Sequence, residues 1–158
     1  METKAHVVLT SDVEPFELDG ASLRLLDGAE HGFGDVSIFI SEYPPNPTGS
    51  DIEHRHPHIS TIVITEGSGR FMVDDETFEA SAGELVVVPA NAWHSFANIG
   101  SGVLRVVGVH DSEHHAVELP TGITLPEDSA LAHYTERSDA QLPIVARSSY
   151  LGERLGDH

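Results

Sequence analysis

Short alternating segments separated by turn residues are the feature of this sequence that most constrains its fold. Apolar and polar residues alternate over many short runs, and glycine, proline, asparagine and aspartate punctuate the chain between them. This period of two is typical of half-buried strands, whereas patterns with the period of a helix are scarce. Many short strands at about 8–12-residue spacing favour an antiparallel barrel or sandwich. The sequence therefore predicts an all-β fold.

The expected strands fall between residues 6 and 110. They are His6–Leu9, Ser22–Leu26, Val36–Glu42, His58–Thr65, Arg70–Val73, Thr77–Ala80, Glu84–Val88, Trp93–Asn98 and Leu104–His110. Prolines interrupt weaker patterns beyond Leu119, where we expect an irregular tail with one short helix over Asp128–Tyr134. The predicted organisation is one barrel domain over residues 1–118, with its core motifs in residues 48–110, and a C-terminal extension over residues 119–158.

Composition narrows the chemistry and the partners. A chain of 158 residues is long enough for one domain with a proper core. It contains no cysteine, so a transition metal must be held by histidine and carboxylate. Asp plus Glu number 26 against 8 Lys plus Arg, a formal charge of -18 that would repel nucleic acid and anionic membranes. Such acidity suits a salt-rich cytoplasm or reflects the base composition of a genome.

Two features predict a cytoplasmic protein. The first residues lack a basic region followed by an apolar stretch, and no apolar run approaches the roughly 20 residues of a spanning helix.

Four histidines stand out, three of them in one short segment. His54, His56 and His58 alternate in the segment His54-Arg55-His56-Pro57-His58, and His94 follows 40 residues after His54. Alternate residues of an extended segment point to one face, so these imidazoles are expected to share a side. A further imidazole from a distant strand would complete a three-nitrogen site for a divalent transition metal.

Read together, these segments resemble the cupin superfamily, and in particular its small single-domain members. The first cupin motif is a His-x-His pair, a glutamate three or four residues later, and a glycine after a short strand. The second is Gly, five residues, Pro, one residue, Gly, two residues, His, three residues, Asn. The matching positions are His54, His56 and Gly67 for the first motif, and Gly83, Pro89, His94 and Asn98 for the second, with Asn91 at the inner glycine. Asparagine also tolerates positive φ at such a turn.

The resemblance implies a single cupin barrel, a double-stranded β-helix or jelly roll, with a metal held by His54, His56 and His94. One departure is Ser60, which stands where the motif has glutamate, so the implied site has three histidines and no carboxylate. His58 lies about 6.6 Å further along the strand than His56, and is expected as a pocket residue or an acid or base, with metal ligation as the alternative. His110 ends the last strand, where it either reaches the cavity mouth as an acid or base or lies on the surface.

Three neutral imidazoles leave the metal its full charge and several open positions. By resemblance, the first hypothesis is a mononuclear non-haem iron(II) dioxygenase acting on a small chelating molecule, with Phe96, Ile62 and Ile64 lining the pocket. A second hypothesis is a cyclase or isomerase that uses zinc, nickel or manganese, with His58 or His110 as base. A third is a barrel that binds a small ligand without catalysis.

Partner expectations follow from the same observations. No helix-turn-helix pattern or basic patch appears, so DNA binding is not expected. The resemblance implies a homodimer that exchanges N-terminal strands from the segment His6 to Leu26, which would also cover a sheet edge.

Overall fold

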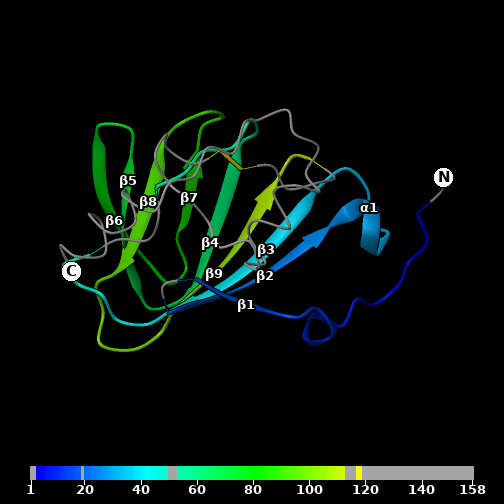
Figure 1. Ribbon diagram of the computed structural model, residues 1–158, viewed down its shortest axis with the longest axis horizontal. Helices are drawn as coiled ribbons and strands as arrows, with labels where there is room; N and C mark the ends of the chain where they lie inside the picture. Colours follow the sequence, from blue (N-terminus) through cyan, green and yellow to red (C-terminus); the bar gives the residue numbers. More distant parts are fainter. Residues whose placement is uncertain (1–2, 19, 50–52, 113–116, 119–158) are drawn as a thin grey trace.

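The described part of the chain folds into two antiparallel sheets that face each other (Figure 1). The computed structural model describes residues 3–18, 20–49, 53–112 and 117–118. The extension over residues 119–158, including the helix expected at Asp128–Tyr134, lies outside the described residues, and the domain division stays a prediction. In chain order the elements are η1 (Thr10–Asp12), β1 (Phe16–Leu18), β2 (Ala21–Asp27), α1 (Gly28–His31), β3 (Ser37–Tyr43), β4 (Ser60–Glu66), β5 (Ser68–Val73), β6 (Glu76–Ser81), β7 (Leu85–Val88), β8 (His94–Asn98) and β9 (Leu104–His110).

The strand order is that of a jelly roll. One sheet has six strands in the order β1-β2-β3-β9-β4-β7, and the other has three in the order β6-β5-β8. Every pairing between these strands is antiparallel. The all-β barrel predicted from the alternating pattern is confirmed.

The expected strand over His6–Leu9 is wrong. Residues 3–9 form no strand, and their exposed stretch precedes β1 in Figure 1. Val7 is 91% exposed. Alternation is not sufficient for a strand, because a strand also needs a neighbour to accept its hydrogen bonds. None of the described strands pairs with this segment.

Rows of side chains across the six-stranded sheet form its half of the core. Residues directly opposite each other in antiparallel strands point to the same face. Phe39 of β3, Gly108 of β9 and Ile62 of β4 form one such row. The Phe39 ring occupies the space over Gly108, where a Cβ would lie 1.9 Å from its Cε1 atom. The facing sheet contributes Phe71 and Phe96, whose ring centroids are 5.1 Å apart.

The row at one end of this sheet is mostly polar although it is buried, with Val88 of β7 beside Ser60 as its apolar end. His110 of β9 lies directly between Ser37 of β3 and Ser60 of β4. Asp27 of β2 extends the row beyond Ser37. The exposed fractions are 0% for Ser37, 1% for His110, 1% for Ser60 and 9% for Asp27. The adjoining row, with Phe39, Gly108 and Ile62, is apolar by contrast, and the buried Ser41 lies one row further on.

Two turns support the motif assignments. Asn91 has a φ of 63°, so the positive φ expected at the inner glycine position of the second motif is confirmed. Gly67, at the turn after β4, has a φ of 85°, and a Cβ there would lie 2.5 Å from the carbonyl oxygen of Val103. Glycine therefore suits this turn for both its conformation and the close approach of the neighbouring backbone.

Candidate metal centre

The backbone places His54 directly opposite His94. The His54 N–H donates to the His94 carbonyl over 3.0 Å, and the His94 N–H donates back over 2.9 Å. Such a pair forms one rung of an antiparallel ladder, so both side chains point to the same face. Their ring centroids are 4.3 Å apart. The first and second motifs therefore meet at this rung.

Arg55 links the same segment to a second part of the chain, at Glu118. Its backbone exchanges two hydrogen bonds with Glu118, of 3.0 and 2.9 Å, and its Nε donates to the Glu118 carboxylate over 2.7 Å. Its guanidinium also lies 4.6 Å from the centroid of the Trp93 ring. The next carbonyl, that of His56, accepts a 2.7 Å hydrogen bond from the Asn91 N–H. These contacts hold residues 54–56 extended between two neighbours and leave His54 and His56 on a common side.

His54, His56 and His94 form a compact group of metal-binding character. One ring nitrogen from each lies within 4.8 Å of the other two. His56 and His94 are buried, and His54 is half-buried. All three donors are imidazole nitrogens, which suit a divalent transition metal.

His94 is oriented and kept neutral by its surroundings. Its Nδ1 lies 2.9 Å from the Ala92 carbonyl oxygen, which can only accept, so Nδ1 carries the proton and donates it. Nε2 then retains the lone pair that a metal requires. Burial lowers the pKa of His94 to about 3, with a smaller contribution from nearby His54, while the Ala92 hydrogen bond opposes this shift. A neutral imidazole with an outer hydrogen-bond acceptor fits a metal ligand.

A second group of histidines adjoins the first. His56, His58 and His110 also bring one ring nitrogen each within 4.8 Å of the others, and all three are buried. The His110 ring centroid lies 4.4 Å from that of His56 and 4.5 Å from that of His58. His58 thus meets His56 and His110 instead of joining the group formed with His54 and His94.

His110 lies inside the barrel, so the surface position that the sequence left open is wrong. A signal for this was present, since Leu104, Val106, Gly108 and His110 share the inward parity of β9. Leu104 and Val106 are both 0% exposed. The alternation of the strand therefore continues to its last residue.

Ser60 stands at the start of β4 with its side chain in the polar row beside His110. Within the described residues, the buried hydroxyls of Ser60 and Ser37 have no hydrogen-bond partner. Neither histidine group includes a carboxylate. The glutamate position of the first motif thus faces the histidines but carries only a short hydroxyl.

The three residues expected to line a pocket lie in the apolar core. Ile62, Ile64 and Phe96 are 1%, 1% and 3% exposed. Ile62 is the closer of the two isoleucines, one row from His110, and Phe96 packs against Tyr43 with ring centroids 4.9 Å apart. Their role as pocket residues stays a prediction.

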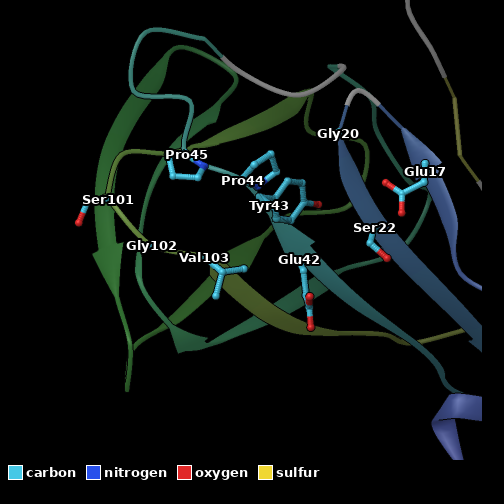
Figure 2. A pocket seen from close by; sticks show the side chains of 10 residues that line it. All are labelled: Glu17, Gly20, Ser22, Glu42, Tyr43, Pro44, Pro45, Ser101, Gly102 and Val103. Carbon is cyan, nitrogen blue, oxygen red and sulfur yellow. The ribbon is translucent and has the colours of Figure 1, made fainter.

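A shallow groove lies away from the histidines. Figure 2 shows it around Tyr43 and Pro44, with Glu17, Ser22 and Glu42 on one side and Val103 on the other. Its volume is about 450 Å³. Tyr43 ends β3 six residues after Ser37, a distance of about 20 Å along a strand. The groove is therefore distinct from the candidate metal centre.

Sequence comparisons agree with this geometry. Residues 39–110 match the family described as Cupin domain. Polyketide synthase CurC of Streptomyces cyaneus is 30% identical over 110 residues, which cover 66% of this chain and 68% of that protein. The chain belongs to the cupin family. This cupin is also 24% identical over 104 residues to the HTH-type transcriptional regulator PuuR of Escherichia coli, covering 66% of the chain and 55% of the regulator. It thus spans about half the length of that relative.

Solved structures share the fold. Oxalate decarboxylase from Bacillus subtilis superposes with a TM-score of 0.65 at 22% identity, covering 83% of this cupin and 37% of that chain. Oxalate decarboxylase from Lactobacillus farciminis gives a TM-score of 0.63 at 23% identity, covering 70% of this cupin and 34% of that chain. At these identities the likeness concerns the fold alone.

Two further observations concern partners. The four residues of α1 are the whole α-helical content of the described residues, so this part of the chain contains no helix-turn-helix. No helix in it has the length and apolar character needed to cross a membrane.

Proposed function

We propose that this cupin binds one divalent transition metal ion through His54, His56 and His94 and acts on a small chelating molecule. The observation that carries the proposal is the meeting of three imidazole nitrogens within 4.8 Å at the junction of both motifs. An ion bound there would polarise substrate oxygens or, as iron(II), activate dioxygen. We favour the iron(II) dioxygenase-like activity implied by the three-histidine resemblance.

The chain's own residues would position and protect the ion. The Ala92 carbonyl orients His94, and the backbone pair with His94 fixes His54. Because the donors are neutral, an ion would keep its +2 charge and its affinity for anionic oxygen ligands. Ser60 supplies no carboxylate, which leaves one more position for a substrate. The expected substrate therefore has two oxygens placed to chelate one ion, as in an enolised diketone, a hydroxy acid or a catechol.

A cyclase or isomerase is the second candidate. The similarity to polyketide synthase CurC favours it, and His58 and His110 lie beside His56, where either would move a proton. Zinc, nickel or manganese would then be the ion, and Mn(II) centres are named for the oxalate decarboxylase of Bacillus subtilis.

The similarity to PuuR, a transcriptional regulator, favours a third candidate, a barrel that binds a small ligand without catalysis.

Elemental analysis of protein purified anaerobically, without chelators or a metal-affinity column, tests the proposal. We expect about one transition metal ion per chain and, with iron(II), oxygen consumption in the presence of a chelating enol or catechol. Metal content without oxygen consumption, together with isomerisation or cyclisation under nitrogen, would favour the second candidate. A chain that takes up no ion after incubation with iron(II) or zinc would contradict both enzyme proposals.

The homodimer implied by the resemblance stays a prediction. The outer faces of β4 and β7 offer apolar surface for it, since Val63, Leu85 and Val87 are 38%, 54% and 56% exposed. β7 is also an edge strand of the larger sheet.

A further inference from the structure

His56 belongs to both histidine groups. On one side it meets His54 and His94, at ring-centroid distances of 5.0 and 5.2 Å. On the other it meets His58 and His110, at 5.3 and 4.4 Å. The five imidazoles form one continuous cluster with His56 at its centre. The favoured function uses only His54, His56 and His94 as metal ligands.

We propose that His56, His58 and His110 form a second position for a divalent metal ion, which shares His56 with the first position. The three donors lie within 4.8 Å of one another and come from two independent parts of the chain, the segment before β4 and the end of β9. Bonds of about 2.0–2.1 Å in a tetrahedral site place ligand nitrogens about 3.4 Å apart. The nitrogens are thus at most about 1.4 Å further apart than such a site requires, a difference that side-chain rotations can close.

The surroundings of the second position are suited to a hydrated ion. His110 lies in the polar row between Ser37 and Ser60, whose buried hydroxyls have no hydrogen-bond partner among the described residues. A buried hydroxyl without a partner costs free energy. Water molecules held by an ion would supply the missing partners. The two serines therefore give an observation independent of the histidine distances.

The two positions compete for the same ligand. A neutral imidazole has one N–H and one lone pair, so His56 donates to one ion at a time. An ion at either position consequently takes His56 from the other, and the chain binds one ion distributed over two positions. The part of the inference that concerns competition rests on the proposed function, whereas the second position does not.

Competition gives a quantitative expectation. When one ion chooses between two exclusive positions, the observed association constant is the sum of the two separate constants. His54→Ala removes one ligand of the first position only, and His58→Ala removes one ligand of the second only. The two variants are closely matched, because both residues lie two positions from His56 on one segment.

Co²⁺ binding by equilibrium dialysis, followed by visible absorption, tests this expectation in the full chain. We expect one Co²⁺ per chain in the wild type and in each single variant. The association constants of the two variants should sum to that of the wild type, and their spectra should differ and reproduce it as a weighted sum. The double variant His54→Ala/His58→Ala should lose at least about 100-fold in affinity, as should His56→Ala. The histidine control His31→Ala, in α1, should bind as the wild type does.

Several results would overturn the second position. It is excluded if His54→Ala loses Co²⁺ as completely as the double variant, and competition is excluded if the wild type binds two ions. Loss in His58→Ala with retention in His54→Ala would support the second position and contradict the proposed ligand set. Far-UV circular dichroism checks folding. His94→Gln and His110→Gln, one from each position on β8 and β9, replace the first pair if either member does not fold.

Discussion

At His94 a single carbonyl group decides which ring nitrogen faces the cluster. The hydrogen bond to Ala92 fixes the proton on Nδ1, and burial keeps the ring neutral. Neutrality matters because a protonated imidazole has no lone pair to offer. The protonation state of His94 therefore links metal binding to the stability of the fold.

Acid should destabilise the metal-free protein through His94. Its pKa in the folded state is about 3, below the ordinary value of 6.5, so only the unfolded chain takes up this proton between those values. The contribution to stability is complete above about pH 6.5 and is lost as the pH falls towards 3. Between pH 7.5 and pH 5 we expect a loss of about 2 kcal/mol in the free energy of unfolding from this residue.

Urea unfolding with EDTA present measures this loss. His94→Gln, which has no titrating ring, should show a correspondingly weaker pH dependence over the same range, while the two proteins should respond alike to pH above 7.5. An equal pH dependence in the two proteins would contradict the assignment to His94.

Asn91 and His110 show which features of single residues can be predicted from the sequence. The positive φ at Asn91 was predictable, because it depends on local turn chemistry. The contacts of His110 were not, since they depend on which residues of β3 and β4 stand opposite it. Inward parity alone would have indicated burial, but only the register places a serine on each side of the ring.

Among the elements, the segment 54–56 depends most on distant parts of the chain. Most other strands begin and end within two residues of the expected positions, because turn residues bound them. This segment instead lies outside the named strands, and single rungs with His94 and Glu118 hold it. Its alternation was visible in the sequence, whereas its neighbours were not.

Arg55→Met should weaken the candidate metal centre without changing any of its proposed ligands. The change keeps an apolar stem but removes the ion pair with Glu118 and the guanidinium over Trp93. We expect a loss of roughly 1 kcal/mol in the free energy of unfolding, since each contact contributes a fraction of that. Co²⁺ affinity should fall several-fold, because Arg55 separates two proposed ligands.

The matched control for this prediction is Arg105→Met. Arg105 also pairs with carboxylates, Glu42 and Glu66, but it belongs to the exposed face near the other end of β9. The Arg105→Met variant should leave the Co²⁺ affinity unchanged. Equal weakening of Co²⁺ binding by the two variants would show that Arg55 has no special role in positioning the histidines.

In the whole molecule, the candidate centre depends on how the two sheets close. The sequence predicted the barrel and the first histidine group, because both motifs have characteristic internal spacing. The second group needs β9 between β3 and β4, an order in which strands distant in the chain become neighbours. One sequence does not specify such pairing, so the meeting of His58 with His110 could be found only in the folded structure.

The net charge of the whole chain should make the stability of the fold depend on salt. A formal charge of -18 on 158 residues gives a self-repulsion that unfolding relieves. The screening length falls from about 30 Å at 0.01 M salt to about 8 Å at 0.15 M. Raising NaCl over this range should therefore raise the thermal midpoint by several degrees, where about 1 kcal/mol corresponds to roughly 3 °C for a chain of this size. Differential scanning calorimetry measures the shift.

Two controls separate screening from other effects of salt. KCl should act like NaCl, because screening depends on ionic strength and not on the identity of a monovalent cation. At pH 4.7, close to the isoelectric point, the gain should vanish because the net charge approaches zero. A rise in the thermal midpoint of the same size at both pH values would instead indicate strengthened apolar burial. No rise at neutral pH would show that repulsion between the acidic groups does not destabilise this fold.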